Sequence, residues 1–85
     1  MFYVYILQSE KDLNLYVGST KDLKKRFLEH NSGKVSSTKH IVPFDLIYYE
    51  AYRSEKDARK REHNLKLDGR ALVQLKGRIC ESIMN

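Results

Sequence analysis

The sequence lacks the features of secreted, membrane-spanning and disulfide-linked proteins. Its only cysteine is Cys80, so an intramolecular disulfide and a structural zinc site made of cysteines are both excluded. No apolar run approaches the roughly 18 residues that a transmembrane helix needs. The apolar segment at residues 1–7 is too short for a signal peptide and has no basic leader. These absences favour a cytoplasmic protein without a membrane partner.

The length excludes several large enzyme folds. With 85 residues the chain is too short for a Rossmann domain or a TIM barrel, which need roughly 150 and 250 residues. It also contains no P-loop, no glycine-rich dinucleotide motif and no histidine pair at metal-ligand spacing. Hydrophobic residues make up 41% and charged residues 32%, which is typical of a globular protein. We therefore expect a single small domain over residues 1–85.

Positive charge is concentrated in parts of the chain. Lysine and arginine outnumber acidic residues by 16 to 11, and residues 21–34 alone carry a net charge of +3. Residues 53–63 and 66–85 carry +2 each, whereas 1–20 and 35–52 carry −1 each. A basic surface attracts polyanions, of which nucleic acid is the commonest, although many small basic proteins bind none. The residues predicted to contact nucleic acid are Lys25, Lys39, His40 and Arg61.

Hydrophobic periodicity predicts the element order β-β-α-β-α-α. The expected strands cover residues 2–7, 13–18 and 44–52, and the expected helices cover residues 21–31, 55–67 and 70–84. The natural arrangement is an α+β domain in which helices pack on a three-stranded, mostly antiparallel sheet. Its core would span about residues 2–67, and the last helix would close it with an apolar stripe. That stripe comprises Leu72, Leu75, Ile79 and Ile83.

A hairpin of the first two strands brings two tyrosines together. A polar turn at residues 9–12 would pair Val4 with Val17 and Tyr5 with Tyr16. The aliphatic side chains then share one face of the sheet and the tyrosines share the other, which supports this register. The two phenols are either an ordinary aromatic cross-strand pair or a pair presented at a site.

The ends of the helices carry recognisable signals. Thr20 is the expected N-cap of the first helix, and Gly33 is its expected C-terminal stop. The second helix is expected to end at Asp68 and Gly69. Cys80 falls within the third predicted helix, where we expect it to pack.

Two charged residues fall on helix faces that the periodicity turns inward. Glu62 follows Ala58 by one turn, and a carboxylate there needs a cationic partner or a metal. Arg26 precedes Phe27 and lies one turn before His30. Its guanidinium could clamp a phosphate, or its stem could pack while its head reaches water.

Together these residues resemble a known nuclease family. The segments Tyr3-Val4-Tyr5 and Tyr16-Val17-Gly18, with ten residues between them, are similar to the paired motifs of the GIY-YIG superfamily. Arg26 stands ten residues after Tyr16, as the helix arginine of that family does. The segment 58–62 is similar to the helix motif that supplies the metal-binding glutamate. Among the members of this superfamily, the chain is most similar to the short stand-alone bacterial ones.

The chain also departs from the family pattern. Tyr3 replaces the glycine of the first motif, a change that is associated with the short members. Gly18 keeps the glycine of the second motif, where the resemblance implies a structural role. Many relatives have an asparagine late in the domain, and neither Asn64 nor Asn85 can be assigned to that position from the sequence.

The resemblance implies hydrolysis of a phosphodiester bond with one divalent ion, Mg²⁺ or Mn²⁺, held by Glu62. Arg26 would neutralise charge on the phosphate. Tyr5 would act as the general base, with Tyr16 helping or orienting it, and His30 would hold Tyr5 or contact phosphate. A phenol is protonated at neutral pH, so this role needs Arg26 and the metal to favour the phenolate.

Family analogy favours DNA over RNA as the substrate. One alternative is a module that binds nucleic acid with little or no catalysis of its own. Another is a protein-interaction domain that docks through its last helix. So small a protein offers little surface for specific recognition, and a homodimer or a partner protein would supply more.

Overall fold

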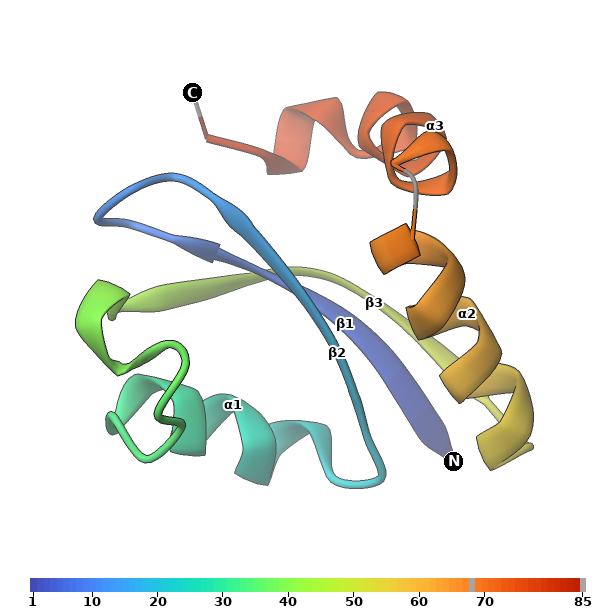
Figure 1. Ribbon diagram of the computed structural model, residues 1–85, viewed down its shortest axis with the longest axis horizontal. Coiled ribbons are helices and arrows are strands. Elements are labelled where there is room, and N and C mark those ends of the chain that lie inside the picture. Colours follow the sequence, from blue (N-terminus) through green and yellow to red (C-terminus); the bar gives the residue numbers. More distant parts are fainter. Residues whose placement is uncertain (68, 85) are drawn as a thin grey trace.

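The computed structural model describes residues 1–67 and 69–84 (Figure 1). Asp68 and Asn85, which were considered above as a helix breaker and a late asparagine, lie outside the described residues. In chain order the elements are β1 (Phe2–Ser9), β2 (Leu15–Thr20), α1 (Leu23–Asn31), the 3₁₀ turn η1 (Lys39–Ile41), β3 (Phe44–Tyr52), α2 (Glu55–Leu67), α3 (Arg70–Arg78) and the 3₁₀ turn η2 (Cys80–Ser82). The predicted α+β class and the order β-β-α-β-α-α are confirmed.

The sheet has the order β2-β1-β3, and both strand pairs are antiparallel. Helix α1 covers one face, and α2 with α3 covers the other (Figure 1). The first core cluster comprises Val4, Ile6, Ala58, Leu65 and Leu75, and the second comprises Tyr5, Leu7 and Phe44. Alternate side chains of β1 belong to the two clusters, because successive side chains of a strand point to opposite faces of the sheet. Leu72 and Ile79 of the predicted stripe pack against the first cluster.

The predicted register of the hairpin is wrong by two residues. Tyr5 pairs with Gly18, and Tyr16 pairs with Leu7. Strand β1 continues to Ser9, and the connection then turns at Leu13, whose φ of 63° is left-handed. Because the shift is even, every side chain keeps its predicted face. The shift places Gly18, rather than Tyr16, directly beside Tyr5.

Helix α1 starts later than predicted. Its N-cap is Asp22, whose carboxylate accepts the Lys25 N–H at 3.1 Å. Thr20 instead ends β2, and its hydroxyl oxygen accepts the Asp22 N–H at 3.1 Å. The C-terminal end follows the prediction, because Gly33 has φ 75° and its N–H donates to the His30 carbonyl at 3.2 Å.

Helix α3 ends at Arg78, six residues before the predicted end at residue 84. The chain then turns through η2, where Cys80 is exposed instead of packed. Buried Gln8 explains this path, because its side chain accepts the Met84 N–H at 2.8 Å and donates to the Met84 carbonyl at 2.9 Å. Among the described residues no helix is long and apolar enough to cross a membrane.

A polar network joins β3 to α2. The carboxylate of Glu50 accepts hydrogen bonds from the Tyr48 and Tyr52 phenols and a forked pair from Arg61, with both Nε and Nη2 at 3.0 Å. Burial alone would raise the pKa of Glu50, but these hydrogen bonds outweigh it and lower the pKa below its ordinary value. Burial and the bond to Glu50 raise the pKa of Tyr48 and Tyr52 to about 12. The network therefore favours the ionised carboxylate in the fold.

We expect Glu50→Gln to lower the free energy of unfolding by about 1.5–3 kcal/mol at neutral pH, because Arg61 loses a charged acceptor. The lowered pKa makes this stabilisation fully present above the ordinary pKa of glutamate and lost as pH falls through the folded value. Urea denaturation at neutral and acidic pH measures both effects.

Glu55→Gln is the matched control for this variant. Glu55 also pairs with an arginine on α2, Arg59 at 3.6 Å, but both side chains are exposed. Loss of this exposed ion pair in Glu55→Gln should change the free energy of unfolding by less than about 0.5 kcal/mol. The stabilising role of the ionised Glu50 carboxylate would be contradicted if both variants lowered the free energy of unfolding equally. It would also be contradicted if the loss of stability in Glu50→Gln stayed unchanged in acid.

Candidate active site

A cleft of about 510 Å³ opens beside edge strand β2. In Figure 1 this strand passes between α1 and α2. The lining of the cleft includes all five residues predicted to be catalytic: Tyr5, Tyr16, Arg26, His30 and Glu62. The two tyrosines and the α1 residues lie on one face of the sheet, whereas Glu62 comes from α2 on the other. They meet because β2 is the last strand on this side of the sheet, so no further strand separates the helices.

A buried chain of hydrogen bonds runs from β1 through α1 to the following loop. The Tyr5 Oη lies 3.0 Å from Nε2 of His30, and Nδ1 of His30 lies 3.0 Å from the Thr38 Oγ1. The Thr38 hydroxyl in turn donates to the Val35 carbonyl at 3.4 Å. Since its proton is directed to Val35, the Thr38 oxygen accepts from Nδ1–H. Nε2 is then the unprotonated nitrogen, and it accepts the Tyr5 O–H.

The charge state of His30 agrees with this pattern. Burial lowers the pKa of the His30 imidazole, and the nearby Arg26 guanidinium lowers it further, against a smaller opposing effect of Glu29. His30 is therefore neutral at neutral pH and can accept a proton. Tyr16 differs, because burial and then the Asp12 carboxylate raise the pKa of its phenol. Tyr16 therefore stays protonated and is suited to donating a hydrogen bond.

Tyr5 lies against the backbone of β2. A Cβ atom added at Gly18 would be 2.3 Å from the Tyr5 Oη and 2.5 Å from its Cζ. Real Cβ atoms essentially never approach other atoms this closely. Glycine at this position is therefore what allows the buried phenol to reach His30. This is a physical reason for the structural role expected of Gly18.

Glu62 is positioned at the cleft by two neighbours. The Ser19 hydroxyl donates to its Oε1 at 2.5 Å, and the Lys66 ammonium lies 2.6 Å from its Oε2. Burial raises the pKa of Glu62, but the hydrogen bonds from Lys66 and Ser19 outweigh it and lower the pKa below its ordinary value. Glu62 is thus ionised at neutral pH. The expected cationic partner is present, and the carboxylate still faces the cleft.

Arg26 of α1 lines the same cleft as Glu62 of α2. Its Nη1 is 3.7 Å from the Glu29 Oε1, a long contact, and its side chain is 39% exposed. A guanidinium this weakly held and this accessible can turn toward an anionic ligand.

Comparisons with known proteins identify the domain. A sequence profile described as the GIY-YIG catalytic domain matches residues 1–76. The chain belongs to the GIY-YIG family. Its members are nucleases that generally depend on a metal ion, so nucleic acid is the substrate class of the family.

Similar proteins come from several bacteria. A UPF0213 protein of Staphylococcus saprophyticus is 40% identical over 65 residues, which cover 75% of this chain and 78% of that protein. One of Streptococcus pyogenes is 43% identical over 61 residues, which cover 71% of this chain and 65%, just under two thirds, of that protein. The solution NMR structure of a UPF0213 protein from Bacillus halodurans has a TM-score of 0.57 and 36% identity, covering 96% of this chain and 93% of that one. The predicted similarity to short bacterial GIY-YIG members is confirmed.

Residues of both GIY-YIG motifs line the cleft. Tyr3-Val4-Tyr5 lies on β1 and Tyr16-Val17-Gly18 on β2, so the hairpin places the last residue of one motif beside the last residue of the other. Asn64, considered for the late asparagine of the family, is exposed on α2 and does not line the cleft.

The donor set fits a hard divalent ion. No group of three or more His, Cys, Asp or Glu side chains that could hold a metal occurs in residues 1–67 and 69–84. Glu62 is the one acidic residue in the lining of the cleft as described. A single carboxylate suits Mg²⁺, which keeps several waters and takes further ligands from a phosphate. The Lys66 ammonium on Oε2 shows that this carboxylate already attracts a cation.

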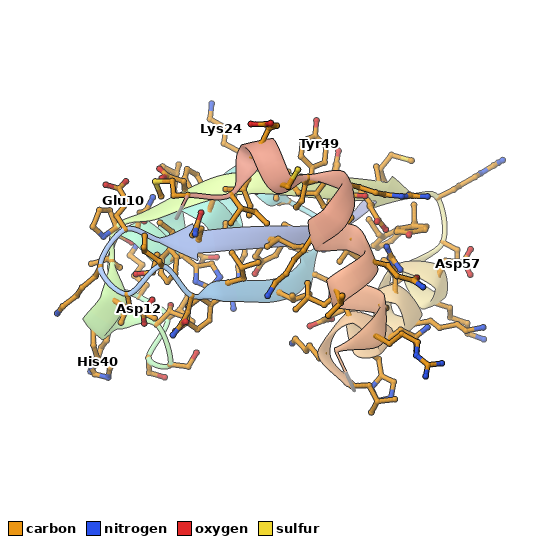
Figure 2. All side chains as sticks on the ribbon, turned by 90° about the horizontal axis from the view of Figure 1, so that it is seen from above. Glu10, Asp12, Lys24, His40, Tyr49 and Asp57 are labelled. Atoms are coloured by element: carbon orange, nitrogen blue, oxygen red, sulfur yellow. The ribbon has the colours of Figure 1, made fainter. Side chains whose placement is uncertain are left out.

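The four residues predicted to contact nucleic acid lie outside the cleft lining. Lys25 is exposed on α1, and Lys39 and His40 are exposed in η1, where Figure 2 shows His40 projecting at one end of the molecule. Arg61 faces β3, because its guanidinium is held by Glu50. The geometry thus gives Arg61 a structural partner and adds no support for a contact with nucleic acid.

Three polar residues that form hydrogen bonds with Glu62 or His30 in the cleft were absent from the sequence-based set. Lys66 follows Glu62 by one helical turn, which is the usual spacing of helix ion pairs and a signal that could have identified it. Ser19 lies just beyond the predicted end of its strand. Thr38 lies in a loop without periodicity, so only the folded structure brings it to His30.

Proposed function

We propose that this protein is a metal-dependent endonuclease that hydrolyses phosphodiester bonds in DNA, using one divalent cation and Tyr5 as the general base. The observation that carries the proposal is the convergence in one cleft of a Tyr5–His30 hydrogen bond, the partly exposed guanidinium of Arg26 and the carboxylate of Glu62. Each group has a different task in phosphodiester hydrolysis.

Tyr5 would take a proton from the attacking water. Its own O–H is directed to Nε2 of His30, so a lone pair of the phenol oxygen remains for the water. As the water proton arrives, the Tyr5 proton passes to Nε2, and Tyr5 never carries a full negative charge. This relay is favoured because a free phenolate is costly at neutral pH. Thr38 keeps Nε2 available by accepting Nδ1–H.

Arg26 and Glu62 would handle the charge of the phosphate. The Arg26 guanidinium would donate to the non-bridging oxygens as the water oxygen bonds to phosphorus and the bond to the leaving oxygen breaks. Glu62 would hold the divalent cation, which when bound supplies Lewis-acid polarisation of the scissile phosphate and stabilises the leaving oxygen. The Lys66 ammonium would then give up its hydrogen bond to the Glu62 Oε2, and its positive charge would remain near the phosphate.

Conversion of supercoiled plasmid to relaxed circles tests the proposed activity. We expect relaxed circles with Mg²⁺ or Mn²⁺ and none after chelation with EDTA. Binding of plasmid and of branched DNA without cleavage of either would favour a module that only binds DNA. The net charge of +5 predicts that binding in either case weakens steeply with salt.

A further inference from the structure

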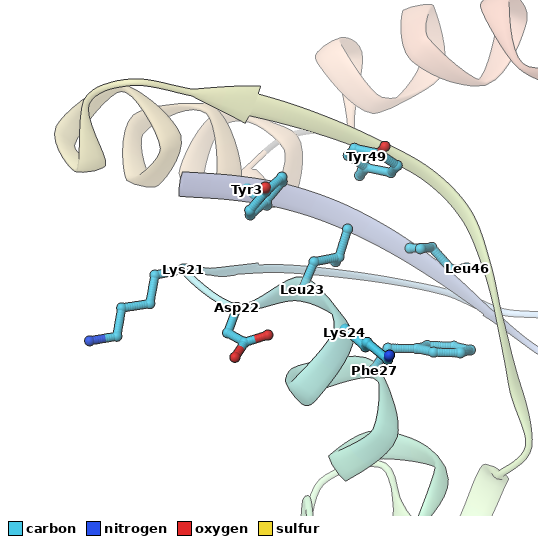
Figure 3. Close-up of a pocket in the computed structure, with 8 residues that line it drawn as sticks. All are labelled: Tyr3, Lys21, Asp22, Leu23, Lys24, Phe27, Leu46 and Tyr49. Atoms are coloured by element: carbon cyan, nitrogen blue, oxygen red, sulfur yellow. The ribbon is translucent and has the colours of Figure 1, made fainter. Parts of the chain in front are cut away.

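A second hollow lies between the first turns of α1 and strands β1 and β3 (Figure 3). Its volume is about 490 Å³, and it shares no lining residue with the cleft among those described. Strands β1 and β3 supply Tyr3, Leu46 and Tyr49, and the first turns of α1 supply Leu23 and Lys24. The proposed nuclease chemistry uses none of these side chains.

The floor of the hollow is aromatic and accessible. The rings of Tyr3 and Tyr49 meet edge to face, with centroids 5.9 Å apart and planes at 65°. Tyr49 is 53% exposed, although it lies in the middle of a nine-residue strand. Figure 3 shows both rings above Leu23, facing the start of α1. An exposed tyrosine ring that is backed by a second, half-buried ring in a hollow is a surface on which a flat aromatic ligand can stack.

The rim of the hollow is basic. Lys21 and Lys24 belong to its lining, and Figure 2 shows Lys24 and Tyr49 projecting on the same side of the molecule. The acidic residue of the lining, Asp22, is engaged as the N-cap of α1, where it accepts the Lys25 N–H. The helix N-terminus therefore compensates its charge. Aromatic rings beside lysines are the combination that binds single-stranded nucleic acid without reading its sequence.

We propose that this hollow binds a single-stranded segment of the DNA, with a base stacked on Tyr49 and a phosphate at Lys24. This inference rests on the proposed nuclease function and specifies its substrate class. Helix α1 contributes to both linings, with Lys24 at the hollow and Arg26 at the cleft, and a helix with its side chains is about 10–12 Å wide. A strand leaving the cleft can therefore cross α1 and reach Tyr49. The favoured substrate is DNA with an unpaired segment next to the cleavage site.

Fluorescence anisotropy with a labelled oligothymidylate tests this site. We expect Tyr49→Leu to weaken binding by about fivefold to 150-fold, the range that corresponds to loss of one stacking ring. Tyr49→Phe keeps the ring and should bind within about twofold of wild type. Val73→Ala, a truncation of an exposed apolar residue on α3, should not change binding. Lys24→Gln should reduce the salt slope by about 0.7.

The outcomes separate this inference from the proposed function. If the wild type nicks plasmid and Tyr49→Leu binds oligothymidylate as tightly as wild type does, the hollow has no such role and the nuclease proposal stands. If Tyr49→Leu instead abolishes a dimer seen by sedimentation and leaves oligothymidylate binding unchanged, the hollow is an interface between copies. If the wild type neither nicks plasmid nor binds the oligonucleotide, both proposals fail. Circular dichroism of each variant confirms that the fold is retained.

Discussion

Replacing Tyr5 with phenylalanine should lower the rate of DNA cleavage by about 100-fold to 10,000-fold, the usual contribution of a general base. The substitution removes one oxygen and leaves the ring that packs with Leu7 and Phe44. It also breaks the bond to His30, which should cost about 0.5–1.5 kcal/mol of stability. DNA binding should persist, because Arg26 and the surface lysines are untouched.

Single-turnover cleavage of plasmid, with DNA affinity measured in parallel, checks this expectation. Tyr52→Phe is the matched control, because it removes the same atom and one hydrogen bond from a tyrosine that lies outside both the cleft and the hollow. The control should cleave at the wild-type rate. Cleavage by Tyr5→Phe within tenfold of wild type would remove Tyr5 from the role of base.

Gly18→Ala should also reduce cleavage severely, by an amount comparable to Tyr5→Phe. The new Cβ would occupy space 2.3 Å from the Tyr5 Oη, and the phenol is confined on its other side by the bond to His30. The ring must therefore turn away, which breaks the alignment of the proton relay. Overpacking of this kind should cost about 1–3 kcal/mol of stability.

A second glycine provides the control for Gly18→Ala. A Cβ at Gly77 in α3 would meet no atom within 4 Å, so Gly77→Ala should leave cleavage unchanged. Its stability should rise by about 0.5–1 kcal/mol, because alanine favours helix. The double variant of Gly18→Ala with Tyr5→Phe should be no slower than the slower single variant, because both changes act on one group. If Gly18→Ala cleaved DNA at the wild-type rate and had wild-type stability, the close contact between position 18 and the Tyr5 phenol would be contradicted.

Much of the fold follows from local patterns in the sequence. The faces of β1 and β2 were predictable because alternation of apolar side chains specifies a face. The register was not, because the connection turns at Leu13, a residue without the usual turn chemistry, and because the buried polar residues Gln8 and Ser9 lengthen β1. The end of α3 was missed for a related reason. Gln8 binds Met84, a contact between residues 76 positions apart that no local pattern reveals.

The cleft was predictable where charge conflicts with periodicity. The positions of Glu62 and Arg26 predicted a site, because charged groups on inward helix faces need partners. The contact between Tyr5 and Gly18 was hidden by the error in register, since that error placed Tyr16 at the position of Gly18. Thr38 gives no signal in the sequence, because its function depends on the tautomer of a histidine eight residues away. The roles of all these groups in catalysis stay predictions.

Metal-dependent nicking of supercoiled plasmid by the wild type, Glu62→Gln and Glu55→Gln tests most directly whether Glu62 holds the metal of a nuclease. The two variants make the same change on the same helix, but only Glu62 faces the cleft. With Mg²⁺ we expect the wild type and Glu55→Gln to nick at equal rates and Glu62→Gln to be at least about 100-fold slower. Nicking by Glu62→Gln at the wild-type rate in the same Mg²⁺ would contradict both the placement of the metal at Glu62 and the proposed metal-dependent mechanism.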